Sequence, residues 1–310
     1  MFTVWLEQWL ARIGPVRPAC HTALAGLVSL CLCGAALSKD KGDDDDDSAT
    51  KAAPTFPTTY LDLRTIYTTV PAGTISVGFS SPALVTLATL ASLPTTLSSP
   101  SGRSIAVDVP LTVDLNDRIS VYGGFSGSAS QTGTAPWTSF DISSVNFGFQ
   151  ADIYQQNGGS IPTITVQSTV TRAVPAAPLA TTSYNTILEA DYALNQDETR
   201  GLLAGVQYTG VVVDAAFASV KPNTIGYLGA YYQWDNNWKL TGRAGVQSFG
   251  GAQLLRLTPI QPFTQPIVRV DLDRMDDNDN RLFGVTAQIS WTPKPSYQLT
   301  VRTPLYAVRN

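Results

Sequence analysis

The stretch IAVDVPLTVDL, residues 105–115, carries an apolar side chain at every second position. Because successive side chains of a β-strand point to opposite faces, this stretch predicts a strand with one apolar and one polar face. The alternation resumes directly after Asn116-Asp117, with Arg118 on the polar face and Ile119 on the apolar face, and continues to Phe125. Two alternating runs separated by so few residues predict a β-hairpin with a tight turn.

Similar alternating stretches recur about 40 residues apart, and each recurrence holds two strands with one short and one longer connection. Short turns at one end and long loops at the other are typical of bacterial outer-membrane barrels, whose turns face the periplasm. We therefore expect an all-β protein, a single antiparallel up-and-down barrel of about twelve strands, with both termini on the periplasmic side. The strands are expected at 73–80, 103–115, 118–127, 138–155, 162–172, 183–194, 201–213, 224–234, 238–248, 266–274, 281–292 and 296–307.

The residues before the barrel divide into three segments. Residues 1–36 indicate a cleaved signal peptide, because basic residues precede an apolar stretch at 23–33 and small residues follow it. Residues 37–58 include five consecutive aspartates and predict a disordered acidic leader. For residues 59–72 two interpretations stay open, an additional strand or a plug, and residues 73–310 are expected to form the barrel.

Export with signal cleavage would remove every cysteine and the only histidine of the chain. Cys20, Cys31, Cys33 and the single histidine, His21, all lie in the expected signal peptide. Nucleophilic mechanisms that need His or Cys, and zinc sites built on them, are thereby excluded from the mature chain. We expect no catalytic residue, no metal site and no cofactor, and we expect that the protein is not an enzyme.

The charge balance also excludes a class of partner. The chain has 20 Lys+Arg and 24 Asp+Glu, a net charge of −4, without a basic cluster. Nucleic-acid binding is not expected from such a chain. Charged residues make up 14% of the sequence, against about 25% in an ordinary soluble domain. Few charges, many small polar residues and strict alternation suit a membrane barrel.

Periodicity alone does not separate a barrel in lipid from a soluble β-sandwich, but three further features favour lipid. Most of the expected strands have about ten or more residues, the length of a tilted membrane crossing. The apolar face of the cleanest strands carries no Lys, Arg, Asp or Glu. The tryptophans after the signal peptide all lie at expected strand ends, which are the positions expected for an aromatic girdle at the membrane interfaces. They are Trp137, Trp234, Trp238 and Trp291.

The polar face would then line the lumen, where charges of both signs either brace the wall as ion pairs or form a selective pore. The candidate pore-lining residues are Asp108, Asp114, Arg118, Asp152, Glu189, Asp191, Lys239, Arg243, Arg269, Asp271, Asp273 and Arg302. Small inward residues are expected to leave room at the centre, among them Gly124, Gly148, Gly205, Gly245 and Gly284.

Three stretches carry a resemblance to known proteins: PAGTISVGF (71–79), LTVDLNDRISVYGGF (111–125) and VNFGFQADIYQQNGGSIPTITV (145–166). With them the chain resembles bacterial outer-membrane channels and, more loosely, the barrel family labelled MetA-pathway of phenol degradation. The resemblance implies an outer-membrane barrel that passes small hydrophobic or aromatic compounds, and it transfers no functional residue. The chain departs from such barrels at its end, where Tyr306 to Asn310 lack a terminal aromatic residue.

These observations lead us to expect a porin-like channel or passive transporter in the outer membrane of a Gram-negative-type envelope. Its partners would be outer-membrane lipid and a small-molecule solute, and its oligomeric state is left open. Two alternatives remain at this point. One is a plugged barrel with a surface-binding or structural role, and the other is a secreted soluble β-sandwich that binds a ligand.

Overall fold

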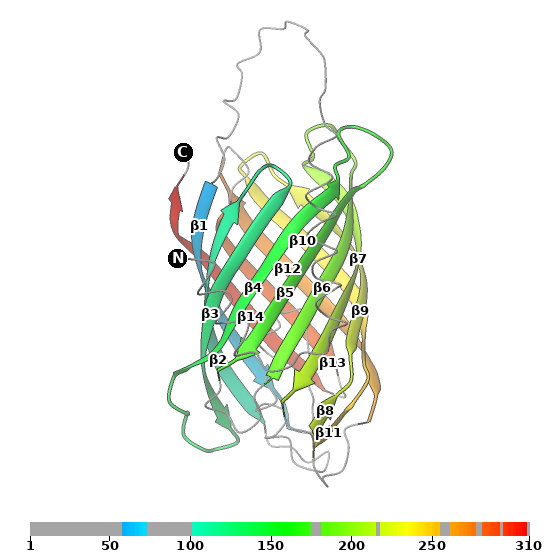
Figure 1. The fold of residues 1–310 in the computed structure, drawn as a ribbon. Coiled ribbons are helices and arrows are strands. Elements are labelled where there is room, and N and C mark those ends of the chain that lie inside the picture. Colours follow the sequence, from blue (N-terminus) through cyan, green and yellow to red (C-terminus); the bar gives the residue numbers. More distant parts are fainter. Residues whose placement is uncertain are drawn as a thin grey trace, which may run out of the picture. The chain divides into compact units, whose positions relative to one another are not determined.

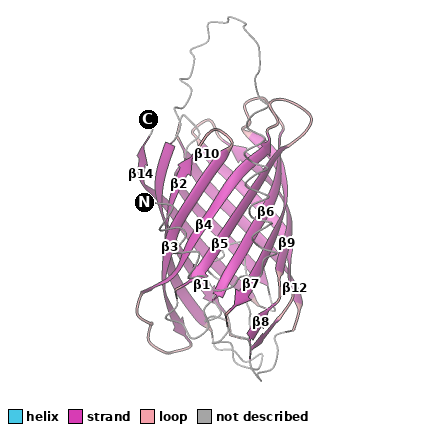
Figure 2. Ribbon diagram, in the orientation of Figure 1, coloured by secondary structure: helices cyan, strands magenta, loops and turns pink. Residues whose placement is uncertain are grey.

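Twelve strands close into one antiparallel β-barrel in the computed structural model of the protein (Figures 1 and 2). The structure describes residues 58–72, 101–174, 181–214, 218–254, 261–276, 281–291 and 294–308. The expected signal peptide, the expected acidic leader and the strand expected at 73–80 lie outside the described residues. No described helix is long and apolar enough to cross a membrane.

The barrel strands are 11 to 14 residues long, so each suffices for a tilted membrane crossing. They are β1 (Thr58–Val70), β2 (Gly102–Asp114), β3 (Ile119–Thr132), β4 (Asp141–Tyr154), β5 (Thr163–Ala173), β6 (Thr181–Ala193), β7 (Arg200–Val213), β9 (Asn223–Gln233), β10 (Trp238–Phe249), β12 (Phe263–Met275), β13 (Arg281–Trp291) and β14 (Pro295–Val308). Two short strands, β8 (Ala218–Val220) and β11 (Ala252–Leu254), form a separate two-stranded sheet.

The strands follow one another around the barrel in chain order, and β14 closes on β1. Thr59 pairs with Val308 and Thr58 with Asp114. The start of β1, the end of β2 and the end of β14 therefore lie at the same rim of the barrel. This rim also carries the short connections between β2 and β3, β4 and β5, β6 and β7, β9 and β10, and β12 and β13, and we call it the turn end. The opposite rim, which we call the loop end, lies on the side of β8 and β11 (Figure 1).

The expected fold class is therefore confirmed, and the barrel begins one strand earlier than expected. Residues 58–70 are β1 in the barrel wall, which settles the open question about residues 59–72. A barrel that starts at residue 73 is wrong, because β1 pairs along its length with both β2 and β14. The soluble β-sandwich is also wrong as a fold, because one sheet closes on itself.

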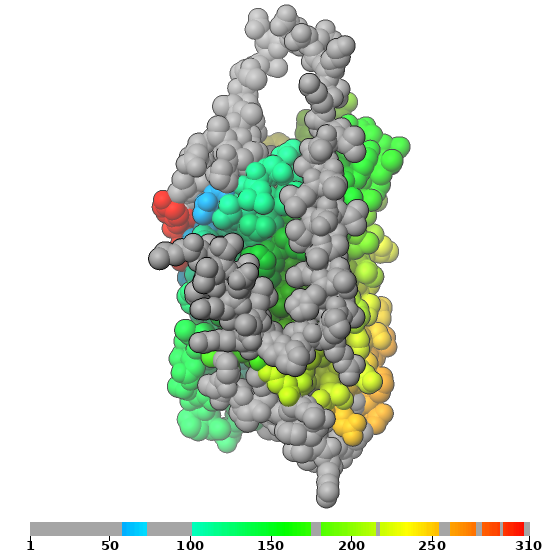
Figure 3. All heavy atoms as spheres, in the orientation of Figure 1, coloured from blue at the N-terminus to red at the C-terminus, as the bar shows by residue number. Residues whose placement is uncertain are grey.

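Polarity is inverted relative to a soluble protein, as a barrel in lipid requires. Along β9, Ile225 and Tyr231 face inward and are buried, whereas Leu228 on the other face is 70% exposed. Gln207 and Gln247 are at most 2% exposed, and Phe147 on the outer face is 62% exposed. Figure 3 gives the same view with all heavy atoms. The outside is apolar and the inside largely polar.

The tryptophans occupy both rims. Trp234 directly follows β9 and Trp238 begins β10, so both lie at the turn end, while Trp291 ends β13 at the loop end. Trp137 lies in the connection between β3 and β4, also at the loop end, and is 41% exposed. Tryptophan and tyrosine are enriched at both membrane interfaces, so this placement fits an aromatic girdle, and contact with lipid stays a prediction.

Several inward glycines do not leave the open space that the sequence suggests. Tyr122 is the cross-strand partner of Gly148, and Tyr227 is the partner of Gly205. A Cβ atom at either glycine would lie closer than 3.0 Å to ring atoms of its tyrosine. These glycines therefore let a tyrosine ring lie flat on the neighbouring strand, and the space is filled. At Gly284 the side chain of Asp273 takes up the space instead.

Candidate functional site

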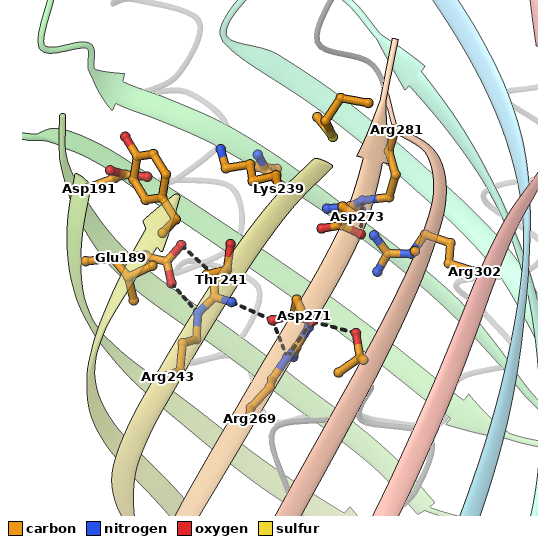
Figure 4. A pocket seen from close by; sticks show the side chains of 16 residues that line it. Glu189, Asp191, Lys239, Thr241, Arg243, Arg269, Asp271, Asp273, Arg281 and Arg302 are labelled. Carbon is orange, nitrogen blue, oxygen red and sulfur yellow. Dashed lines mark hydrogen bonds and ion pairs between the residues drawn. The ribbon is translucent and has the colours of Figure 1, made fainter. Parts of the chain in front are cut away.

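A cavity of about 370 Å³ lies inside the barrel, between the middle of the strands and the turn end (Figure 4). Because side chains alternate between the two faces, it is built from inward positions of β6, β10 and β12 to β14, with contributions from β4, β7 and β9. Its lining is Gln150, Glu189, Asp191, Leu203, Tyr231, Lys239, Thr241, Arg243, Arg269, Asp271, Asp273, Met275, Arg281, Gly284, Thr286 and Arg302.

A chain of ion pairs connects residues of β6, β10 and β12 along the cavity wall. Arg243 of β10 donates from Nε to Glu189 Oε2 at 3.2 Å and from Nη1 to Asp271 Oδ2 at 2.8 Å. Arg269 of β12 donates from Nη2 to Asp271 Oδ1 at 2.8 Å. Charged groups in a restricted space are stable when they are paired and hydrogen-bonded in this way.

Hydroxyl groups complete this network. Tyr227 donates to Glu189 Oε2 at 2.8 Å, and Thr286 donates to Asp271 Oδ1 at 2.5 Å. Asp271 therefore accepts from two arginines and one threonine, and it is 5% exposed. Arg243 and Arg269 are direct cross-strand partners, a like-charged pair that costs stability unless an anion lies between them. Asp271 supplies that anion.

Nearer the turn end the charges are arranged differently. Arg281 Nε lies 2.8 Å from Asp273 Oδ1, and the Lys239 ammonium lies 4.3 Å from the centre of the Tyr231 ring. Figure 4 shows Glu189 and Asp191 on one side of the cavity and Arg281 and Arg302 on the other. The wall opposite these strands, built by β3 to β5, presents mainly hydroxyl groups and amides, such as Thr169 and Gln167. The cavity is thus polar, and charges of both signs alternate along its wall.

Eight of the expected pore-lining residues come together in this cavity, namely Glu189, Asp191, Lys239, Arg243, Arg269, Asp271, Asp273 and Arg302. Whether a solute contacts them stays a prediction.

The other four candidates lie elsewhere. Asp108 is 3% exposed in β2 beside Arg64. Asp114 accepts from Thr58 and Ser120 at the turn end, and Asp152 accepts from Thr165 at 2.7 Å.

Arg118 is misplaced in the sequence reading. The structure begins β3 at Ile119 and leaves Arg118 exposed in the turn that follows β2. The connection between β2 and β3 is longer than a two-residue turn. It is held by Asn116, whose Oδ1 accepts from the backbone N–H of both Arg118 and Ile119. Arg118 is therefore not part of the inner wall.

Sequence reasoning also missed functional candidates. Alternation alone would turn Arg281 outward with Phe283 and Val285, but the register shift beside Met275 brings its side chain to Asp273. Arg64 was missed because its segment was not assigned to a strand. The short alternation Leu61-Asp62-Leu63-Arg64 was the signal that could have found it. No described group of His, Cys, Asp and Glu side chains is placed to hold a metal ion.

No protein-family model matches the chain, and no curated protein matches it. Among solved structures, the chain is similar to an outer membrane channel from Pseudomonas putida F1, with 12% sequence identity and a TM-score of 0.52, over 84% of this chain and all of that one. Two barrels score lower. The translocator domain of the autotransporter NalP from Neisseria meningitidis has 11% identity and a TM-score of 0.42, over 92% of this chain and 96% of that one. The β domain of the Bordetella autotransporter BrkA has 7% identity and 0.42, over 79% and 99%.

At this level of identity the similarity concerns the fold. The predicted resemblance to outer-membrane channels is confirmed in that sense, since the closed twelve-stranded barrel aligns with the whole of a channel of this kind. The looser resemblance to the phenol-degradation family stays a prediction. By its fold, the protein is an outer-membrane-type β-barrel.

Proposed function

We propose that the protein is an outer-membrane channel that passes small polar solutes passively. The observation that carries this proposal is a polar cavity of about 370 Å³, lined by charges of both signs, inside a closed barrel with an apolar exterior. The mechanism needs no catalytic residue and no cofactor. Side chains of the wall replace part of the hydration shell of a solute, and charges of both signs orient it.

The lining favours polar solutes over the hydrophobic or aromatic compounds that the family resemblance implies. Nine of the sixteen lining residues are charged, so an apolar solute would have to pass beside groups that prefer water. Apolar contacts in the cavity are few, chiefly Leu203 and Met275. We therefore propose that the channel passes small polar and charged solutes in preference to hydrophobic or aromatic ones.

Compartment and fold are tested on the cellular protein. Processed protein should partition with outer membranes and resist extraction with carbonate, and unboiled and boiled samples should migrate differently in SDS gels, because a closed barrel keeps its backbone hydrogen bonds internal. Recovery in a soluble fraction with identical migration would exclude a membrane barrel.

Passage is tested with vesicles. Liposomes that contain the folded protein should swell in isotonic solutions of small sugars and amino acids. The rate of swelling should fall for solutes that are too large for the cavity. Swelling at the rate of protein-free liposomes, with protein that is demonstrably folded, would contradict a channel.

A plugged barrel is the second candidate, and one observation favours it. Ile225 and Ile267 are fully buried and Phe249 is 1% exposed, although all three lie on the inner face toward the loop end. A filled half of the lumen would bury them in this way. Liposomes that do not swell, together with an intact barrel, would make this candidate the better account.

A further inference from the structure

We propose that Arg302, with Arg64 beside it, binds the carboxylate group of a small organic acid. The inference rests on the proposed channel function, because it names the class of solute that the cavity receives. It adds a residue-level site, which neither the fold nor the similarity to other barrels assigns.

The first argument is the pairing of two like charges. Arg302 of β14 and Arg64 of β1 are direct cross-strand partners on the inner wall. Side chains in such positions have Cβ atoms about 5 Å apart, so two guanidinium groups there repel each other. The Arg243–Arg269 pair has the same geometry and is neutralised by Asp271. Among the described residues, no carboxylate contacts both Arg302 and Arg64. Of the carboxylates near Arg64, Asp62 lies on its own strand, and its cross-strand partner Asp108 lies on the side away from Arg302.

The second argument is that Arg302 has no partner in the described part of the chain. Its Nε atom is buried without a hydrogen bond, and so is Nε of Arg64. Asp273, the carboxylate two strands away, is held by Arg281 at 2.8 Å. Arg64 has Asp62 at 3.8 Å, a distance too long for a hydrogen bond. Buried charges are normally paired. Because Arg302 is not paired with a described carboxylate, its guanidinium group is available to an anionic ligand.

The third argument is the surroundings. Arg302 lines the cavity, and over its direct neighbour on β13, Gly284, lies the carboxylate of Asp273, which is already paired with Arg281. A guanidinium group binds a carboxylate in a two-pronged arrangement that is stronger than a bond between neutral groups. A cavity of about 370 Å³ has room for a small organic acid and water. Leu203 and Met275 offer apolar contacts for its hydrocarbon part.

The test uses propionate as the probe and propionamide as its neutral counterpart. Binding to the full-length protein, folded in detergent, is followed by saturation-transfer NMR, which needs no ion current. Wild-type protein should bind propionate and not propionamide. Arg302→Gln should weaken propionate binding roughly tenfold or more, because a charge-assisted pair of hydrogen bonds is lost. Arg103→Gln is the matched control, since Arg103 is an exposed cation near the loop end of β2, away from the cavity.

A second readout separates a binding role from a structural one. If Arg302 serves an anion, Arg302→Gln removes a repulsion, so its urea unfolding midpoint should equal or exceed that of the wild type. Propionate should raise the midpoint of the wild type and leave that of Arg302→Gln unchanged.

Equal binding of propionate and propionamide, or unchanged binding in Arg302→Gln, would overturn the inference. A lower unfolding midpoint in Arg302→Gln without propionate would also overturn it, because it would show that the arginine braces the wall. Propionate binding as expected in a protein that passes no solute would refute the channel and leave the site standing.

Discussion

Asp271→Asn is the substitution that the ion-pair network makes most informative. Asp271 is 5% exposed, and its two oxygens accept from Arg243, Arg269 and Thr286. Asparagine has nearly the same shape, but its amide group replaces one acceptor oxygen by an NH2 donor that faces arginine N–H groups. The substitution therefore removes the negative charge between two neighbouring arginines and one of the two acceptors. Two like charges on directly paired residues are then left without the anion between them.

The expected cost is about 2–3 kcal/mol, somewhat below the roughly 3–5 kcal/mol for breaking a fully buried pair. The reduction follows from the retained partner, because Glu189 still accepts from Arg243 at 3.2 Å, and from the partial exposure of both arginine side chains, which are 19% and 24% exposed. Urea unfolding of the protein folded in vesicles, followed by tryptophan fluorescence, measures the cost. Asp114→Asn is the control, because Asp114 accepts from two hydroxyl groups and from no described arginine, and it should cost about 1 kcal/mol or less.

A double substitution tests the reasoning behind this magnitude. Removing Arg269 as well, in Asp271→Asn/Arg269→Gln, removes one of the two repelling cations. The double variant should therefore be more stable than Asp271→Asn alone. Costs that simply add, or an Asp271→Asn variant as stable as the wild type, would refute the idea that Asp271 neutralises the arginine pair.

Two further predictions test the assignment of faces and the packing of the inner wall. Leu228→Arg puts a charge on an outer position that is 70% exposed and should impair folding into vesicles by about 2–4 kcal/mol, whereas Gln150→Arg in the cavity should cost much less; equal penalties would mean that the outer face is misassigned. Gly205→Ala should cost about 1–3 kcal/mol, because its Cβ atom would collide with the Tyr227 ring. Gly226→Ala, on the adjacent strand with nothing within 4 Å, should be nearly neutral, and a reversed order of these two costs would exclude the packing described.

The sequence predicts the architecture well because alternation is a local property. Eleven of the twelve expected strands overlap the observed ones, and even the ends of β9 and β10 agree within a residue. For β1 the sequence does not choose between a strand and a plug, because the alternation is interrupted at Ile66, an apolar residue that lies on the inner face with Arg64. Pairing of β1 with β14, across nearly the whole chain, is not visible in local pattern.

The candidate site was predicted in composition and not in geometry. Alternation shows that Arg243, Arg269 and Asp271 face the same side, but their contacts depend on the register of β10 against β12. The register shift at Met275 turns Arg281 inward, against the pattern of its own strand. The inward glycines were taken as empty space because the groups that fill it, such as the Tyr122 ring over Gly148 and the Tyr227 ring over Gly205, lie on other strands. Facing partners and register shifts are properties of the closed sheet.

The central claim, that the barrel is an open and charge-lined channel, is tested most directly by single-channel recording in planar bilayers. Folded wild-type protein should open small, steady conductances. Lys239→Gln should shift the ion preference toward cations, because one positive charge of the cavity is lost. Arg103→Gln, which removes a charge outside the cavity, should leave the preference unchanged. Bilayers that stay silent with folded protein would contradict the channel, and an ion preference that ignores Lys239→Gln would contradict the assignment of this cavity to the conducting path.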